Sequence, residues 1–386
     1  MTTSPQNSGV LASNGGNDQI ADDLDLLQQM MDDLKEASPL YKPTNYWAYY
    51  EKQFLPELRR LGLRDLRRRR DSVLSSFGAT DLAIKPQVKP KPGIRGVSPV
   101  ARMLTSFFDR NPFLELGQTL VTAEAFTRYF HAHTKEKFER IRMDLGNVPA
   151  STCGKPDDLV EIEGLPWSRS HLQYCSMFAD AARYIKFPAQ GVLCELGPGM
   201  GRNIEVMAKL FEDATFLLFE IPPQLYVANQ YLRTIFGPRV ISYREAIAMS
   251  PASGDASIPP AAKGKILVLP TWRMPAWATT KVDVFWNSAS FQEMEPDVVM
   301  NYLRLVISMK PEWIYINAHP RGCLWGDGKT QDGGSRVPVT ESVYVQTLKD
   351  RYDLHCTYGT DYFLRPRALT SYIFARKQGT APAEVR

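Results

Sequence analysis

A glycine turn that directly follows a short apolar run is the feature of this sequence that most constrains its fold. The run Val192–Leu196 leads into the string Gly197-Pro198-Gly199-Met200-Gly201, and a helix is expected from about Asn203. Glycines let the backbone approach a ligand closely, and the first turn of a helix offers N–H groups and the positive end of its dipole. Strand, glycine turn and helix in this order are typical of nucleotide-binding α/β folds.

The rest of the C-terminal half supports this fold class. Short apolar runs alternate with helical patterns, which predicts an α/β domain with a mainly parallel, Rossmann-like sheet and helices on both faces. Strands are predicted at 191–196, 215–220, 239–244, 265–269, 282–287, 313–318, 353–360 and 368–376. Of the third and fourth of these strands, one is expected at a sheet edge or in an insertion. The last two are expected to form an antiparallel hairpin.

The N-terminal part has a different character. Residues 1–19 are rich in Ser, Asn and Gly, which predicts a disordered tail. Residues 20–165 form a predicted helical region that builds a substrate wall, a dimer surface or both, and residues 166–386 form the ligand-binding domain. Helical patterns lie at 20–34, 46–77, 100–110 and 122–143, followed by a Gly/Pro-containing connection at 144–165.

One charge run stands out in this helical region. The run Arg67–Arg70 is interpreted first as a solvated helix face. A docking patch for an anionic partner is the alternative.

Composition narrows the class of protein. The 386 residues carry a formal net charge of +4, which is too small an excess to indicate a nucleic-acid partner. The five cysteines are scattered without a C-x-x-C pair, which disfavours a disulfide framework or structural zinc and favours the cytoplasm. No apolar stretch approaches the roughly 18 residues of a membrane span. The first 34 residues contain no Lys or Arg, so the basic start of a targeting peptide is missing.

Two carboxylates near the glycine turn indicate which ligand it takes. Glu220 ends the next predicted strand, where a carboxylate can accept both hydroxyl hydrogens of a ribose. The spacing G-x-G-x-G departs from the G-x-G-x-x-G of NAD-binding turns, which disfavours an NAD-dependent oxidoreductase. Glu195 would repel a diphosphate but suits an ammonium group. S-adenosylmethionine (SAM) offers an ammonium, a sulfonium and a ribose, so SAM is the predicted cofactor and S-adenosylhomocysteine its product.

Longer strings carry a resemblance to a known family. The string Glu195–Arg202 (ELGPGMGR) resembles motif I of class I SAM-dependent methyltransferases, and Leu218–Leu232, Lys265–Trp272 and Asp283–Met294 narrow the resemblance. Together they are similar to sugar O-methyltransferases of bacterial polysaccharide and natural-product clusters. In those proteins an acidic residue and a proline turn follow the second strand, and an N-[ST]-x-S-[FM]-x-E-M string follows the fourth. The resemblance covers about residues 167–376, with Glu220 where the family more often has Asp.

This resemblance implies a class I methyltransferase sheet and a set of cofactor contacts. Glu220 would hold the ribose, with Ile221 beside the adenine. Asn287 and Ser288 would face the sulfonium and the acceptor. The methionine end of the pocket would be shaped by Glu195, Gly197, Pro198, Gly199 and Gly201.

Methyl transfer to a hydroxyl also needs a group that takes up the hydroxyl proton, and two residues sit where the strands' carboxyl ends open into a crevice. His319 directly follows the predicted strand 313–318, and a histidine there suits proton abstraction near neutral pH. A substrate hydrogen bond and a structural turn are its alternatives. Glu293 lies after the fourth core strand, and capping of the helix near Pro296 is its alternative. His171 is a third, weaker candidate.

The sequence therefore predicts an SAM-dependent O-methyltransferase acting on a sugar hydroxyl, in a small molecule or a glycan. A divalent metal is not supported, since Asp327 and Asp332 in a long glycine-rich loop are its only weak ligands. A homodimer is left open. The alternatives are a methyltransferase of another small-molecule hydroxyl or amine, and a catalytically idle SAM-binding assembly module.

Overall fold

The computed structural model describes residues 19–68, 112–249, 258–322, 333–362 and 365–378. The predicted tail (apart from Gln19), the predicted helix at 100–110, and Asp327 and Asp332 lie outside these residues. Among the described residues, no helix combines the length and the apolarity needed to cross a bilayer.

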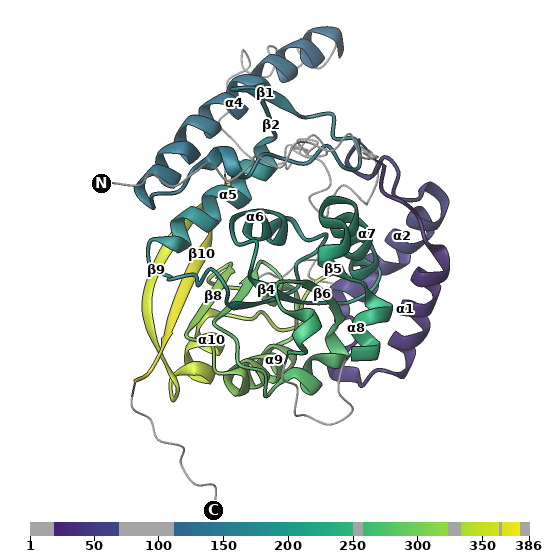
Figure 1. Cartoon of the computed structure of the whole chain (residues 1–386), viewed down its shortest axis with the longest axis vertical. Coiled ribbons are helices and arrows are strands. Elements are labelled where there is room, and N and C mark those ends of the chain that lie inside the picture. The colour runs from purple at the N-terminus through teal and green to yellow at the C-terminus, as the bar shows by residue number, and fades with distance from the viewer. Residues whose placement is uncertain (1–18, 69–111, 250–257, 323–332, 363–364, 379–386) are drawn as a thin grey trace, which may run out of the picture.

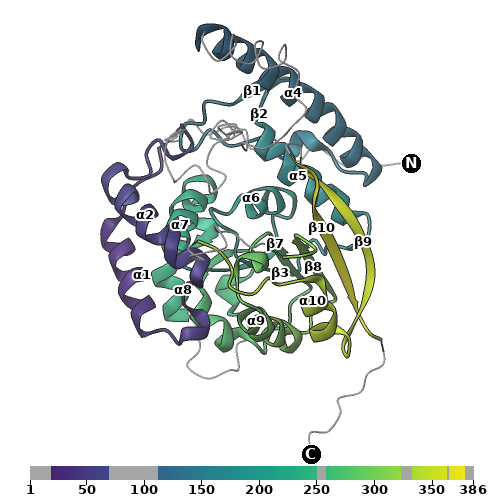
Figure 2. The ribbon, with the colours of Figure 1, turned by 180° about the vertical axis from the view of Figure 1, so that it is seen from behind.

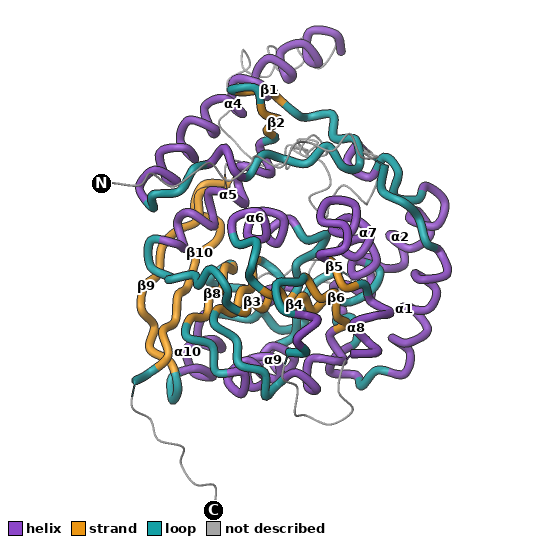
Figure 3. The backbone as a smooth tube through the Cα atoms, viewed as in Figure 1, coloured by secondary structure: helices purple, strands orange, loops and turns teal. Residues whose placement is uncertain are grey.

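An eight-stranded sheet organises most of the described part of the chain (Figures 1 and 3). Its strand order is β5-β6-β4-β3-β7-β8-β10-β9, with parallel pairing from β5 to β8 and antiparallel pairing of β10 with both β8 and β9. The strands are β3 (Val192–Leu196), β4 (Thr215–Glu220), β5 (Val240–Ile241), β6 (Ile266–Pro270), β7 (Val284–Ser288), β8 (Trp313–Ala318), β9 (Tyr352–Tyr362) and β10 (Arg365–Arg376).

This order confirms the predicted mainly parallel, Rossmann-like sheet, including the edge strand and the final antiparallel hairpin. The chain starts the sheet in its middle with β3 and places β4, the edge strand β5 and then β6 on one side. It then crosses to β7 on the other side of β3. The direction of winding therefore reverses between β3 and β7. In open α/β sheets, ligands bind at the carboxyl ends of the strands beside such a switch point.

Helices cover both faces of the sheet because its central strands are apolar on both sides. Every residue of β4 and β6 is buried. One face packs against α5, α6 and α7, and the other against α8, α9 and α10. The helices are α4 (Pro112–Arg140), α5 (Arg169–Ala182), α6 (Arg202–Leu210), α7 (Gln224–Phe236), α8 (Tyr243–Met249), α9 (Pro296–Met309) and α10 (Glu341–Leu348).

Two N-terminal helices, α1 (Leu24–Glu36) and α2 (Asn45–Leu61), lie along the outside of α7 and α8 (Figures 1 and 2). Asp23 caps α1 by accepting a 2.8 Å hydrogen bond from the backbone N–H of Leu26. Apolar side chains of both helices, such as Leu27 and Phe54, belong to the same buried cluster as the sheet face beneath α7. The division of the chain at residues 165 and 166 stays a prediction.

The sequence prediction was wrong at three places in this N-terminal part. The helix expected over 46–77 ends at Leu61, because Gly62 adopts φ +63° and the helical path stops there. The expected connection at 144–165 contains a short antiparallel hairpin of β1 (Val160–Ile162) and β2 (Leu165–Trp167).

The third correction concerns the arginine run. Arg67 is neither a solvated helix face nor part of a docking patch, because it is 1% exposed and donates to the carbonyl oxygen of Ser151 at 2.5 Å. Arg68 is exposed, and Arg69 and Arg70 lie outside the described residues.

Candidate active site

A cavity of about 260 Å³ opens at the carboxyl ends of β3, β4 and β7, beside the switch point of the sheet. The glycine turn forms one wall, and the ends of β4 and β7 form the next. Ser290, Glu293 and Met294 after β7, together with residues at the start of α2, form further parts of the wall. The cavity therefore combines elements from the sheet with the N-terminal helices.

Gly197, Pro198 and Gly199 line the cavity, as the resemblance implies for a cofactor pocket. Gly197 has φ +71°, and a Cβ atom there would lie 2.3 Å from Ser290 Oγ. Gly199 has φ +59°, but a Cβ atom there would meet nothing within 4 Å. The open space at Gly199 fits a ligand that approaches the backbone closely. Gly201, with φ +91°, caps α6 against Leu232 and does not line the cavity.

These two glycines predict a contrast between two alanine variants. Each alanine would cost about 1 kcal/mol for its positive φ, but Gly197→Ala would add about 1–3 kcal/mol for overlap with Ser290. We therefore expect chemical denaturation to show a larger loss of stability for Gly197→Ala. Gly199→Ala should mainly weaken nucleoside binding, because its methyl group would occupy the open space. Equal losses of stability in the two variants would contradict this description of the turn.

Glu220 ends β4 and lines the cavity. Its carboxylate accepts hydrogen bonds from the backbone N–H of Gly199 (2.7 Å) and of Ile221 (2.8 Å). Burial raises the pKa of Glu220 to about 7, and the two N–H donors oppose the rise. The carboxylate thus sits between the glycine turn and the next loop, and Ile221 lines the cavity beside it.

Glu195 is buried at the end of β3 but does not line the cavity. Its Oε1 accepts a 2.7 Å hydrogen bond from Asn203 Nδ2, while its Oε2 has no hydrogen-bond partner among the described residues. Burial raises the pKa of Glu195 to about 8, against the effect of the Asn203 bond. Asn203 itself lines the cavity. Direct contact of Glu195 with a ligand stays a prediction.

The two predicted residues after the fourth core strand take different positions. Ser288 lines the cavity. Asn287 is fully buried and joins two loops: its Nδ2 donates to Leu196 O at 2.9 Å and to Ser290 Oγ at 2.6 Å. Asn287 therefore links the end of β3, just before the glycine turn, to the loop after β7. Its contact with a cofactor stays a prediction.

Glu293 lines the same cavity as the glycine turn. Burial, and then the charge of Glu220, raise the pKa of Glu293 to about 8, while a hydrogen bond from the Trp47 side chain opposes the rise. Its backbone carbonyl accepts a 2.9 Å hydrogen bond from Thr44 Oγ1. The N-terminal segment thus holds Glu293 at both its backbone and its side chain.

The predicted histidines lie elsewhere. His319 follows β8 as expected but does not line the cavity, and its Nδ1 accepts a 3.3 Å hydrogen bond from the Arg321 backbone. Its role as a base stays a prediction that this arrangement does not favour. His171 is fully buried, with Nε2 2.7 Å from the carbonyl oxygen of Val148. Burial lowers its pKa to about 3, so it stays neutral.

The sequence prediction missed the aromatic part of the cavity. Tyr46, Trp47 and Tyr50 line it from α2, with centroid distances of 5.1 Å between Tyr46 and Trp47 and 4.7 Å between Tyr46 and Tyr50. Tyr174 of α5 and Tyr302 of α9 line it as well. The helical pattern predicted over 46–77 includes these rings, but periodicity alone does not separate a helix face that packs in a core from one that lines a cavity.

Metal ligands do not gather in the part of the chain that the structure describes. No group of three or more His, Cys, Asp or Glu side chains there is arranged to hold an ion.

No protein-family model matches the chain, and no curated protein matches its sequence. Several solved structures have a similar fold. The mitomycin 7-O-methyltransferase MmcR is 15% identical with a TM-score of 0.34, covering 53% of this chain and 57% of its own. Phosphoethanolamine N-methyltransferase 1 of Haemonchus contortus is 14% identical with a TM-score of 0.37, covering 56% of this chain and 46% of its own.

A third similar structure is the magnesium protoporphyrin IX methyltransferase ChlM of Synechocystis with bound SAH. It is 13% identical with a TM-score of 0.37, and the match covers 66% of this chain and 98% of that one. The chain thus spans about half the length of the first two proteins and nearly all of the third. Identities and TM-scores this low carry no argument about activity or substrate.

Proposed function

We propose that this protein is an SAM-dependent O-methyltransferase that acts on a sugar hydroxyl. One observation carries the proposal: the glycine turn, the ribose-binding candidate Glu220 and the carboxylate of Glu293 belong to the lining of the same cavity. SAM, when bound, supplies an electrophilic methyl group. The residues of this chain bind it, exclude water and take up the proton of the acceptor.

The cofactor half of the cavity suits a nucleoside. Glu220 stands at the tip of β4 with its carboxylate toward the glycine turn, where it can accept hydrogen bonds from ribose hydroxyls. Space beside Gly199 admits a ligand close to the backbone. The carboxylates of this cavity also suit a ligand with positive charge better than a pyrophosphate.

The acceptor half combines a base with flat apolar surfaces. Among the described residues, two carboxylate side chains line the cavity, Glu220 and Glu293. Because Glu220 is assigned to the ribose, Glu293 is the base. Tyr46, Trp47 and Tyr50 offer ring faces against which the C–H face of a sugar can pack, and Trp47 also orients Glu293. The hydroxyl would then lie between the carboxylate and the methyl group, and this alignment supplies much of the rate.

A second candidate function is N-methylation of an amine. Aromatic rings around a carboxylate form a site that attracts a cation, and Glu293 with the α2 rings is such a group. Identifying the methylated atom in the product by mass spectrometry and NMR separates the two candidates. An N-methyl product would replace the sugar proposal with this one.

The first experiment is binding. S-adenosylhomocysteine at 100 times its Kd should stabilise the protein by about 2.7 kcal/mol, whereas NAD should have no effect. Stabilisation by NAD alone would overturn the cofactor assignment.

The second experiment is turnover. Methyl-labelled SAM should transfer its label to a sugar in extracts of the host or in a panel of free sugars, nucleotide sugars and glycans. SAM binding without transfer to any compound in the extract would favour an idle assembly module instead.

A further inference from the structure

One buried amide in the cavity wall has an oxygen without a partner. Gln224 is the first residue of α7, lines the cavity and is 4% exposed. Its Oε1 accepts no hydrogen bond from the described residues. Gln230 on the same helix is also buried, but it donates to the carbonyl oxygen of Ala21 at 2.6 Å and accepts from Asn229 Nδ2 at 2.8 Å. The missing partner is therefore a property of position 224 and not of the helix.

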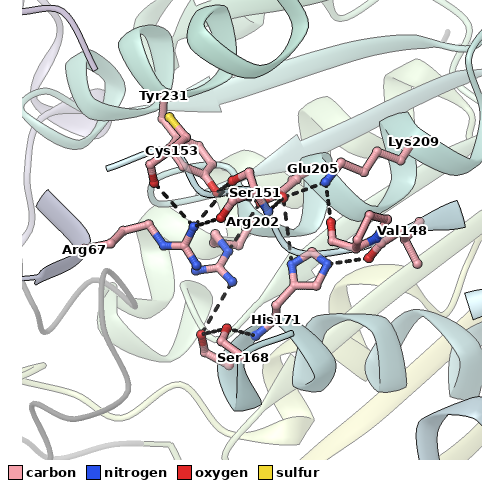
Figure 4. A network of polar contacts seen from close by, with 12 residues as sticks. Arg67, Val148, Ser151, Cys153, Ser168, His171, Arg202, Glu205, Lys209 and Tyr231 are labelled. Atoms are coloured by element: carbon pink, nitrogen blue, oxygen red, sulfur yellow. Dashed lines mark hydrogen bonds and ion pairs between the residues drawn. The ribbon is translucent and has the colours of Figure 1, made fainter. Parts of the chain in front are cut away.

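Polar neighbours in the wall are paired within the protein. Arg202 Nε lies 3.6 Å from Glu205 Oε2, inside the buried network that Figure 4 shows. Asn203 Nδ2 donates to Glu195 Oε1 at 2.7 Å. A buried amide that lacks such a partner is destabilising, because it has given up its hydrogen bonds to water. At Gln224, a molecule bound in the cavity can supply the missing donor.

Hydrogen-bond counting separates this amide from the ribose at Glu220. Each carboxylate oxygen of Glu220 accepts one backbone hydrogen bond, Oε2 from Gly199 and Oε1 from Ile221. A carboxylate oxygen has two lone pairs, so each keeps one for a further donor. The two hydroxyl groups of a ribose are two donors, which is the number that Glu220 can still accept. Gln224 Oε1 is therefore left for another ligand group.

The N-terminal segment that supplies the aromatic wall also packs against α7. The backbone N–H of Asp23 donates to the hydroxyl of Tyr226 in α7 at 2.8 Å, and α1 and α2 lie beside this helix (Figures 1 and 2). Tyr46 and Tyr50 line the cavity from α2, and Gln224 lines it from α7. Because the last torsion of a glutamine is broad, its amide oxygen can turn toward a ligand held by these rings.

We propose that Gln224 accepts a hydrogen bond from a second hydroxyl group of the acceptor, apart from the hydroxyl that is methylated. This inference rests on the proposed function, because it assumes an acceptor bound beside the rings of α2. It narrows the substrate class to polyhydroxy compounds and disfavours simple alcohols. A site built to bind a hydroxyl discriminates against an analogue without it, since the polar group of the site then stays unpaired.

The first test replaces the amide by an apolar side chain of similar size. Gln224→Met should raise the Tm of the protein without ligand by about 2–4 °C, because it removes an unpaired buried amide. Gln230→Met is the matched control. It removes the hydrogen bonds with Ala21 and Asn229, so it should lower Tm. A fall of Tm in both variants would overturn the proposal, because Gln224 would then be a residue that stabilises the fold.

The second test compares the sugar that accepts label from SAM with its monodeoxy derivatives. In the unaltered protein, one derivative that keeps the methylated hydroxyl should lose a factor of about ten or more in kcat/KM. Gln224→Met should show this loss already with the parent sugar and no further loss with that derivative. Gln230→Met should discriminate as the unaltered protein does. If Gln224→Met keeps the full preference for the parent sugar, the assignment is wrong.

Cofactor binding separates the acceptor from the ribose as the source of the hydroxyl. S-adenosylhomocysteine should bind Gln224→Met and the unaltered protein with equal affinity in isothermal titration. If the variant binds it more weakly but binds its 2′,3′-dideoxy derivative normally, the amide contacts the ribose. An equal loss with both ligands would assign the amide to another part of the cofactor. Either result overturns this inference while the cofactor assignment stands. If no sugar accepts the label at all, the proposed function itself is wrong.

Discussion

Replacing Glu220 by alanine is expected to weaken S-adenosylhomocysteine binding by about 100-fold or more. Two hydrogen bonds from ribose hydroxyls to a buried carboxylate together contribute about 3 kcal/mol, which corresponds to that factor. The carboxylate already accepts from Gly199 and Ile221, so it is held in place before any ligand arrives. The measurement is isothermal titration calorimetry. Glu212→Gln, which removes an exposed carboxylate from the turn before β4, is the matched control and should bind normally.

A second ligand separates ribose binding from support of the glycine turn. The unaltered protein should bind 2′,3′-dideoxy-S-adenosylhomocysteine as weakly as Glu220→Ala binds the normal ligand. Glu220→Ala should then lose nothing further with the dideoxy compound, because the partner of the hydroxyls is already gone. If the variant loses the same factor with both ligands, Glu220 acts only on the backbone of the turn, and the ribose assignment fails.

The fold was largely predictable because its strands are short apolar runs with clear ends. The strand predicted at 215–220 is β4 to the residue, since a strand buried on both faces has to be apolar throughout. Conversely, β1 and β2 have three residues each, and at that length pairing with a neighbour decides the conformation more than propensity does. Arg67 shows the same limit, because the carbonyl oxygen that holds it belongs to Ser151, 84 positions along the chain.

The site was predictable only where the position of the backbone decides the role. The end of a parallel strand opens onto the crevice, and Glu220 and Ser288 line the cavity for that reason. The rule does not specify where a side chain points, and His319, also at a strand end, instead accepts a bond from Arg321. The walls supplied by α2 required contacts between segments about 250 residues apart, such as Thr44 with Glu293. No local pattern encodes such a contact.

Replacing Glu293 by glutamine is expected to lower kcat by about 10²–10⁴-fold while leaving S-adenosylhomocysteine affinity nearly unchanged. Glutamine keeps the shape of the side chain and a partner for Trp47, but it cannot take up a proton. Asp297→Asn is the matched control, because Asp297 is an exposed carboxylate in the first turn of α9, outside the cavity. Normal turnover in Glu293→Gln would show that the base lies elsewhere.

The raised pKa of Glu293 also predicts how activity depends on pH. Burial and the neighbouring Glu220 raise the pKa of Glu293 to about 8, and only the ionised carboxylate can accept a proton. The value of kcat/KM should therefore rise about tenfold per pH unit below this pKa and level off above it. The rise of kcat, which reports the enzyme with SAM and acceptor bound, should lie at lower pH than that of kcat/KM. The reason is that the positive sulfonium of SAM beside the Glu293 carboxylate favours its charged form. The rising limb should be absent in Glu293→Gln.

The same pKa predicts an opposite effect on stability, and this separates a base from a structural residue. A carboxyl group with a pKa near 8 in the folded protein, against an ordinary value of 4.5, binds more protons when folded than when unfolded. Its contribution to stability is therefore fully present below about pH 4.5 and is lost as the pH rises through about 8. Glu293→Gln carries no such charge, so without ligand it should gain Tm relative to the unaltered protein at pH 8–9 and not at pH 5. Replacing a residue that stabilises the fold would lower Tm. By contrast, the ionised carboxylate that a base needs lowers the stability of the folded protein when no ligand is bound. Lost turnover together with a higher Tm at high pH is thus the result that identifies Glu293 as the base, and a parallel loss of both would exclude it.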